Sequence, residues 1–256
     1  MSDLLRFEDW ISPVPPVDRE VVSRLVEGED EQPPLLFVTG PGAGAWAFAE
    51  HWLGHAAGRG FPAHALTPRE GGDLRAHVHD VVQVAASLPR QAVLIGHGTG
   101  ALVVSRALGR YPARAAVLVS PVADRWAALG AGLKANLFGT LPALFGGRPR
   151  LNRKQLFSAA VPAEEADAYL SRMTFPHRLV APVKQMPRPV GRPPVLVVGS
   201  PDDRVVPRKT LDRVAAHYGG APLLFPGMAH ALMLDAGWAE PIDAVLDWLT
   251  KELHAG

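Results

Sequence analysis

The chain contains no cysteine in its 256 residues. A disulfide framework, a thiolate nucleophile and a thiolate metal site are therefore excluded. An excess of either charge is also missing, since the chain has 26 Lys and Arg residues and 25 Asp and Glu residues. No run of Lys or Arg is long enough to form a nucleic-acid-binding surface. The predicted partner is a small molecule rather than nucleic acid, and the composition leaves the oligomeric state open.

Long apolar runs are absent as well. No stretch of about 18 uninterrupted apolar residues occurs, so neither a transmembrane helix nor a membrane partner is expected. The first segment, MSDLLRFEDWISPVPPVD, mixes acids with hydrophobic residues and lacks the basic and apolar regions of a signal peptide. We therefore expect a cytoplasmic location.

Short apolar runs alternate with amphipathic segments from Pro33 to Pro121. The runs read LLFVTG, PAHALT, AVLIG and AAVLVSP, and the rhythm resumes later with PVLVVGS and APLLF. Such alternation predicts βα units on a mostly parallel sheet flanked by helices, and the earlier segments LLRFEDWI and REVVSRLVEG predict a strand pair at its edge. Residues 122–194 interrupt the rhythm with helical pieces and a proline-rich stretch. We predict a core over 1–121 and 195–256 and an inserted helical lid over 122–194.

The segment Val93–Val104, VLIGHGTGALVV, predicts a buried strand, a tight turn and a helix. Its outer glycines, Gly96 and Gly100, have the spacing of the G-x-S-x-G nucleophile elbow, but Gly98 stands where the serine belongs. The elbow holds that residue at positive φ, which costs a residue with a side chain about 1–3 kcal/mol and glycine almost nothing. Gly98 therefore predicts a relaxed turn with a vacant nucleophile position.

Three further landmarks follow apolar runs. They are the glycine-rich loop FVTGPGAGAW, the segment VLVVGSPDDRVVP and the loop FPGMAHALML. The second segment contains Asp203, and the third contains His230. Because ligands of open α/β sheets bind beyond the carboxyl ends of the strands, Asp203 and His230 are expected to meet there.

Taken in this order, the four landmarks resemble the α/β-hydrolase family over nearly the whole chain. The resemblance implies an α/β-hydrolase fold and a catalytic pair made of His230 and Asp203, with Asp202 as the near alternative for the acid. An Asp that accepts a hydrogen bond from one ring nitrogen of a histidine leaves the other nitrogen free to act as a general base. Asp124 is a further alternative for the acid, since some relatives of this fold place it after the corresponding strand.

The sequence departs from the family in the parts that perform acyl transfer. Thr39 replaces the histidine of the H-G-x-G oxyanion loop, and Pro41 stands where a backbone N–H donor is expected. The oxyanion-hole-like positions are thus Pro41 and Thr99, of which only Thr99 keeps an N–H. Losing one such donor costs acyl transfer roughly 10² to 10³ in rate.

The leading hypothesis is general acid–base chemistry by His230 and Asp203, without a cofactor, on a small hydrophobic carbonyl-containing metabolite. Reactions of the cyclase, lyase, dehydratase or isomerase type fit, as does water-mediated hydrolysis. The alternatives are a non-catalytic pseudo-hydrolase that binds a ligand or a protein, and an ordinary esterase whose serine was changed to Gly98. The lid segment is predicted to form a hydrophobic ceiling through Leu137, Phe138, Leu141, Leu144 and Phe145.

Other residues are weaker candidates for chemistry. His51 and His55 share a helical face, and His77 and His79 lie beside Asp80, but no third ligand is evident, so no metal site is expected. The loop GPGAGAW partly matches the fingerprint of dinucleotide-binding proteins. A dinucleotide-binding function would leave the loops that contain Asp203 and His230 without a role.

Two residues of the elbow itself also carry functional groups. Thr99 is a candidate substitute nucleophile, although the elbow is expected to turn its side chain away from the pocket. His97 is predicted to pack beside the elbow.

Overall fold

A seven-stranded sheet forms the middle layer of the molecule, with the strand order β1-β3-β2-β4-β5-β6-β7. The computed structural model describes residues 19–27, 32–40, 42–67, 69–123, 125–145, 147, 149–173 and 186–254. Only β1 is antiparallel to its neighbour; all other pairs are parallel, as predicted. The strands are β1 (Val21–Arg24), β2 (Leu35–Val38), β3 (Ala63–Leu66), β4 (Val93–His97), β5 (Ala115–Val119), β6 (Val195–Gly199) and β7 (Leu223–Leu224).

The predicted edge strand is confirmed for the segment that contains β1, whereas LLRFEDWI lies outside the described residues. The central strands are buried along their whole length, which explains why they read as continuous apolar runs. Their side chains still alternate between two separate cores: Leu35 and Phe37 of β2 enter one, and Leu36 and Val38 enter the other.

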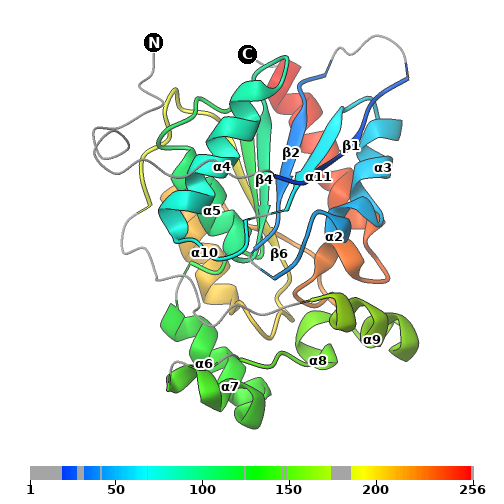
Figure 1. The fold of residues 1–256 in the computed structure, drawn as a ribbon, viewed down its shortest axis with the longest axis vertical. Coiled ribbons are helices and arrows are strands. Elements are labelled where there is room, and N and C mark those ends of the chain that lie inside the picture. Colours follow the sequence, from blue (N-terminus) through cyan, green and yellow to red (C-terminus); the bar gives the residue numbers. More distant parts are fainter. Residues whose placement is uncertain are drawn as a thin grey trace.

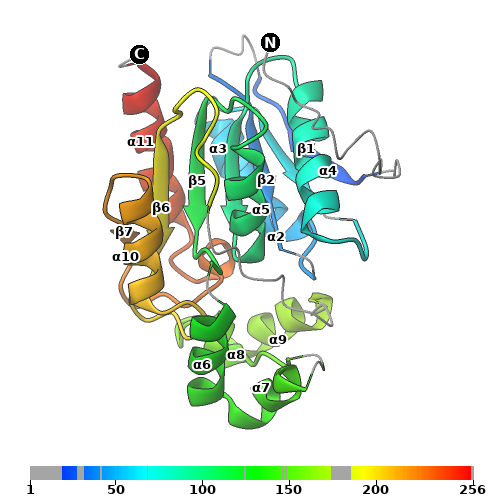
Figure 2. The same ribbon diagram turned by 90° about the vertical axis from the view of Figure 1, so that its left-hand side faces the viewer.

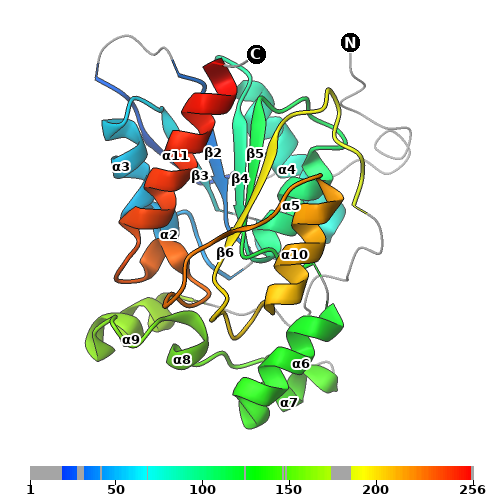
Figure 3. The ribbon, with the colours of Figure 1, turned by 180° about the vertical axis from the view of Figure 1, so that it is seen from behind.

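Helices cover both faces of the sheet (Figure 1). On one face lie α2 (Trp46–Ala49), α3 (Trp52–Gly58) and α11 (Ala239–His254), and on the other lie α4 (Leu74–Ser87), α5 (Thr99–Ala107) and α10 (Arg208–His217). The view from behind shows the same two layers, with α11 and α10 nearest the viewer (Figure 3). This doubly covered sheet is the α/β-hydrolase fold that the sequence predicts.

In the described part of the connection between β5 and β6, four helices lie together beyond the carboxyl ends of the parallel strands (Figure 2). They are α6 (Arg125–Ala135), α7 (Leu137–Leu144), α8 (Arg153–Leu156) and α9 (Ala163–Arg172). They fall within the predicted lid segment, whose residues 174–185 lie outside the described part of the chain.

The start of α5 packs closely against the sheet at two glycines. A Cβ on Gly96 would lie 2.6 Å from the Ala101 Cα, and a Cβ on Gly100 would overlap the backbone carbonyl of Val38. Both glycines are therefore required by close approach of backbone to backbone. This contact fixes the position of Gly98, the residue between them.

Candidate active site

The turn at Gly98 has the backbone geometry of a nucleophile elbow. Gly98 has φ 60° and ψ −119°, and it joins the end of β4 to the first residue of α5. Its N–H donates to the Val119 carbonyl at 3.0 Å, and its carbonyl accepts from the N–H of Val122 at 3.1 Å. A Cβ added at Gly98 would lie 3.4 Å from Nε2 of His230, an ordinary van der Waals distance. A side chain at position 98 would thus face the histidine.

His230 and Asp203 meet beside this turn, as the sequence predicts. The Nδ1–H of His230 donates to Oδ2 of Asp203 at 2.8 Å, and both side chains are buried. The other carboxylate oxygen accepts from the N–H groups of Val205, at 2.7 Å, and Val206, at 2.9 Å. Burial acts to raise the pKa of Asp203, but the adjacent His230 ring and the two backbone donors outweigh it and hold this pKa below its usual range. The pair leaves Nε2 of His230 facing Gly98.

Asp202, the near alternative for the acid, stands apart from this pair. Asp202 accepts from the N–H of Gly227 at 2.7 Å and is exposed, so it is Asp203 that contacts the histidine. Asp124 lies outside the described residues. The catalytic roles of His230 and Asp203 stay predictions.

His97, the residue before Gly98, supports the backbone of His230. Its Nε2 donates to the His230 carbonyl at 2.9 Å, and the two rings lie 4.7 Å apart between centroids at an angle of 51°. Burial, assisted by the nearby His230, lowers the pKa of His97 to about 3. The ring is therefore neutral near pH 7, and it performs the packing role that the sequence indicates.

The oxyanion-like positions are partly described. Gly40 and Gly42 line the cavity, whereas Pro41 between them lies outside the described residues. Thr99 is the first residue of α5, where an N–H has no acceptor within the helix. The Thr99 hydroxyl packs against Gly40, so closely that a Cβ on Gly40 would overlap it. The Thr99 hydroxyl therefore packs against the glycine-rich loop that contains Gly40.

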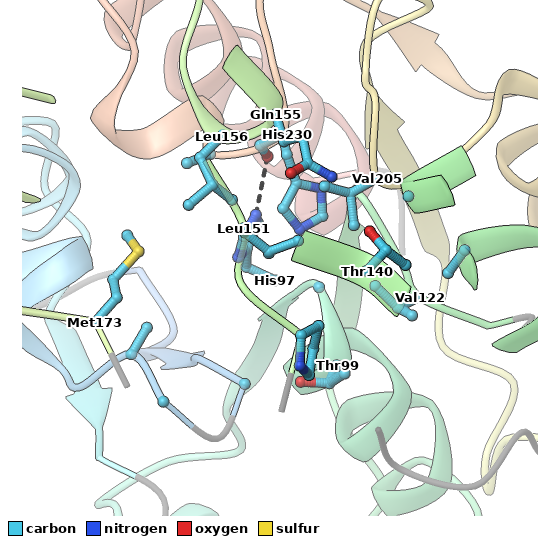
Figure 4. Close-up of a pocket in the computed structure, with 18 of the residues that line it drawn as sticks. His97, Thr99, Val122, Thr140, Leu151, Gln155, Leu156, Met173, Val205 and His230 are labelled. Carbon is cyan, nitrogen blue, oxygen red and sulfur yellow. Dashed lines mark hydrogen bonds between the residues drawn. The ribbon is translucent and has the colours of Figure 1, made fainter. Parts of the chain in front are cut away.

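A cavity of about 140 Å³ opens between the Gly98 turn and the helices beyond the strand ends (Figure 4). The described lining contains no Asp, Glu, Lys or Arg, and its polar side chains are His97, Thr99, Thr140, Gln155 and His230. A cavity with this lining favours a neutral and largely apolar ligand.

The predicted hydrophobic ceiling is wrong in its residues. None of its five large side chains lines the cavity, and all are exposed, Phe138 by 86% and Phe145 by 84%. The helix α7 instead turns Thr140 and Ala143 toward the cavity. The large apolar residues recur at helical spacing on one face of α7, and that face points away from the pocket.

Two buried polar side chains on the helical side of the cavity were missed from the sequence. Oγ1 of Thr140 and Nε2 of Gln155 have no hydrogen-bond partner among the described residues. Figure 4 shows both side chains near His230. The sequence signal was weak. Thr140 is a polar residue in an apolar segment and Gln155 one in a basic segment, and polar residues are also common on exposed helix faces.

The paired histidines are engaged in structural contacts. Nε2 of His55 hydrogen-bonds Asp243 at 2.7 Å, the His51 ring stacks on Trp238 with centroids 4.6 Å apart, and His77 donates to a backbone carbonyl in the loop before α4. No group of three or more His, Cys, Asp or Glu side chains able to hold a metal ion occurs in the described part of the chain.

The covered parallel sheet, the glycine-framed turn and the adjoining His–Asp pair define a protein of α/β-hydrolase architecture. The chain belongs to the alpha/beta hydrolase family, whose pattern it matches over residues 35–248. Among curated proteins, no significant match is found. None of the helices in the described ranges is both long and apolar enough to cross a membrane.

Solved structures with the same fold carry different activities in their names. A monoacylglycerol lipase from Paleococcus ferrophilus has a TM-score of 0.68 at 16% identity, covering 92% of this chain and 100% of its own. A soluble variant of monoglyceride lipase from Saccharomyces cerevisiae, solved with a substrate analog, has a TM-score of 0.72 at 12% identity and covers 91% and 92%. A bromoperoxidase from Bacillus anthracis has a TM-score of 0.64 at 14% identity and covers 91% and 94%. At these identities the likeness shows the fold alone.

Proposed function

We propose that the chain is an enzyme that performs general acid–base chemistry with His230 and Asp203 and forms no covalent intermediate at residue 98. The observation that carries this proposal is the position of Nε2 of His230, 3.4 Å from the point where a Cβ of residue 98 would stand. The nitrogen is held there by the Nδ1 contact to Asp203, while glycine offers no oxygen for attack. A substrate group or a water molecule can occupy the space that a serine would fill.

In this mechanism Nε2 of His230 takes a proton from a carbon next to a substrate carbonyl or from a water molecule. The positive imidazolium that results is stabilised by the carboxylate of Asp203, and it returns the proton later in the reaction. In this proposal the N–H of Thr99, which has no acceptor within the helix, donates to the oxygen on which negative charge develops. Positioned acid–base catalysis of this kind contributes about 10² to 10⁴ in rate.

The proposed substrate is a small, neutral and largely apolar molecule with a carbonyl group, because the described lining of the cavity has no Asp, Glu, Lys or Arg. The chemistry needs no cofactor. The helices α6 to α9, within residues 122–194, act as a lid over a core formed by residues 1–121 and 195–256.

Hydrogen exchange at a ketone tests the proposal directly. The protein is incubated with 4-phenylbutan-2-one in D₂O, and deuterium incorporation beside the carbonyl is followed by NMR. The wild-type protein is expected to accelerate exchange at least about 100-fold over buffer, and His230→Asn is expected to abolish the acceleration. The matched control is His217→Asn, which removes an exposed histidine on α10 and should exchange as the wild type does.

The other outcomes are informative. A wild-type protein that binds the ketone without exchanging its protons would contradict the enzymatic proposal and favour a pseudo-hydrolase that binds and releases a ligand unchanged. Exchange that survives in His230→Asn would place the base elsewhere.

A serine hydrolase whose nucleophile was changed to glycine is the second candidate, and the room for a Cβ at position 98 favours it. The variant Gly98→Ser is compared with Gly98→Ala on p-nitrophenyl acetate, because both carry the same Cβ at positive φ and only one has a hydroxyl. A gain of about tenfold or more in Gly98→Ser alone supports this candidate. Equal rates in the two variants contradict it.

A further inference from the structure

We infer that Gln155 and Thr140 form a polar subsite, on the helical wall opposite Gly98, that binds an oxygen atom of a neutral substrate. The inference rests on the proposed function in taking the cavity beside His230 as the substrate site. It adds residues from α7 and α8 that contact the substrate rather than cover it.

The first step is the orientation of the Gln155 amide. Gln155 is fully buried, and its Oε1 accepts from Nδ2 of Asn136 at 3.0 Å and from the N–H of Asn152 at 3.1 Å. Only the oxygen of an amide can accept two donors, so the nitrogen must occupy the other position. Nε2 of Gln155 is therefore a hydrogen-bond donor whose direction is fixed by two contacts at the other end of the group.

The second step is that this fixed donor is unused. Nε2 of Gln155 has no partner among the described residues, although the side chain lies in the wall of the cavity. A buried donor without an acceptor is costly and rare in native structures, so a ligand oxygen that accepts from this nitrogen would gain a strongly favoured hydrogen bond.

Thr140 provides a second unused group in the same wall. Its side chain is 4% exposed, and its Oγ1 also has no partner in the described structure. The neighbouring helix α6 makes room for this side chain at Gly132, where a Cβ would lie 2.9 Å from both Oγ1 and Cγ2 of Thr140. Figure 4 shows Thr140, Gln155 and His230 around one part of the cavity.

Together these groups define the chemistry of the ligand. Nε2 of Gln155 can only donate, so it requires an acceptor such as a carbonyl oxygen, while the Thr140 hydroxyl can donate to the same oxygen or accept from a hydroxyl. The absence of charged side chains in the described lining excludes a strong preference for an ionised group. The subsite therefore selects a neutral ketone, ester or lactone over a hydrocarbon of the same shape.

Binding of a matched pair of probes tests the subsite without reliance on turnover. The affinities for 4-phenylbutan-2-one and for n-butylbenzene, which lacks the oxygen, are measured by calorimetry in the wild type and in Thr140→Val. We expect Thr140→Val to weaken ketone binding about 5- to 10-fold and to leave n-butylbenzene within about twofold. The melting temperature of the free variant should be unchanged or higher, because the substitution removes an unpaired buried hydroxyl.

A control and a second variant complete the experiment. Leu151→Met changes an apolar residue of the same cavity at nearly constant volume and should leave the preference for the ketone intact. Gln155→Glu keeps an acceptor for Asn136 and Asn152 but removes the amide donor, so ketone affinity should fall about tenfold. If Gln155→Glu fails to fold, Thr140→Val decides alone.

Equal weakening of both probes, or no change in ketone affinity, would overturn the subsite. These results are separable from the proposed function. If the protein prefers the ketone but shows no exchange that depends on His230, the subsite is supported and the enzymatic proposal is contradicted. If exchange depends on His230 but the variants at Thr140 and Gln155 do not change the preference for the ketone, the enzymatic proposal is supported and the subsite is contradicted.

Discussion

His97 and His230 lie side by side with different environments. The His97 ring is enclosed and donates to the backbone of His230, whereas the His230 ring has Asp203 on one nitrogen and the cavity on the other. Burial and the nearby His230 together lower the pKa of His97 to about 3, so protonation of His97 opposes the folded state. One histidine is thereby kept as a neutral support for the other.

The stability of the protein should depend on pH through His97. The unfolded chain binds a proton at His97 below about pH 6.5, while the folded protein resists it until about pH 3, so the unfolding free energy falls as pH falls between these values. His97→Gln keeps a side-chain donor but cannot titrate. We expect its slope of unfolding free energy against pH to be smaller by up to about 1.4 kcal/mol per pH unit.

Urea unfolding at several values between pH 7 and about pH 4.5 measures this slope. The series stops there so that protonation of Asp203 does not add to the slope. The pKa of Asp203 lies below its usual range, so its contribution to the unfolding free energy is lost only at lower pH. His217→Gln on the surface is the matched control. An unchanged slope in His97→Gln would show that the ring does not control acid stability.

The candidate residues were predictable from sequence where the chain itself constrains them. His230 and Asp203 follow strands whose carboxyl ends meet, so topology alone brings them together. Thr140 and Gln155 have no such constraint, because their positions depend on how α7 and α8 rotate and on a hydrogen bond from Asn136. Side-chain orientation within a short helical segment is decided by tertiary packing, which local patterns do not contain.

At the scale of the elements, α5 packs against the sheet through a close backbone contact. Its Gly100 meets the carbonyl of Val38 and the backbone of Thr39, so β2 and the helix touch without intervening side chains. The helix α6, on the other side of the cavity, contains Gly130, around which a Cβ would find nothing within 4 Å. The same substitution should therefore have opposite effects in the two helices.

Gly100→Ala is expected to lower the unfolding free energy by about 2–3 kcal/mol, because the methyl group forces the helix away from the sheet. Gly130→Ala, the matched control, is expected to raise it by about 0.5–1 kcal/mol through the better helix propensity of alanine. Urea denaturation of both variants measures the two effects. A neutral Gly100→Ala would mean that α5 can shift without cost.

Sequence patterns predicted the strands and helices of the sheet layers better than the orientation of α6 to α9. The alternation of βα units fixes the parallel sheet, since each buried strand needs a helix to return. For α7, the sequence predicts a helical piece with large apolar residues but does not say which way the face that carries them points. In the structure that face is exposed, and smaller residues of the helix line the cavity.

At the scale of the whole molecule, the exposed face of α7 and the residue that follows the helix form the main concentration of large exposed apolar side chains in the described structure. Its members are Leu137, Phe138, Leu141, Leu144 and Phe145. Contiguous apolar surface of this kind promotes association and dye binding, whereas single exposed apolar residues do not.

The double substitution Phe138→Ser with Phe145→Ser should reduce the fluorescence of the dye ANS bound to the folded protein by about half or more, since both rings are more than four-fifths exposed. The unfolding free energy should change by no more than about 0.5 kcal/mol. Leu25→Ser, which removes an exposed leucine near β1, is the control. Unchanged dye fluorescence in the double variant would mean that the dye binds in the cavity instead.

The two walls of the cavity, one at the Gly98 turn and the other at α7 and α8, are held in place by different contacts. The wall at Gly98 is fixed by Gly96 and Gly100, whose backbone is in close contact with neighbouring backbone, so a side chain at either of these two positions displaces α5. The opposite wall is built from an eight-residue helix, a four-residue helix and their side-chain contacts. If the proposed function holds, directed evolution of substrate range should succeed at Thr140, Ala143 and Leu151, where residues can be exchanged without moving His230, the proposed base.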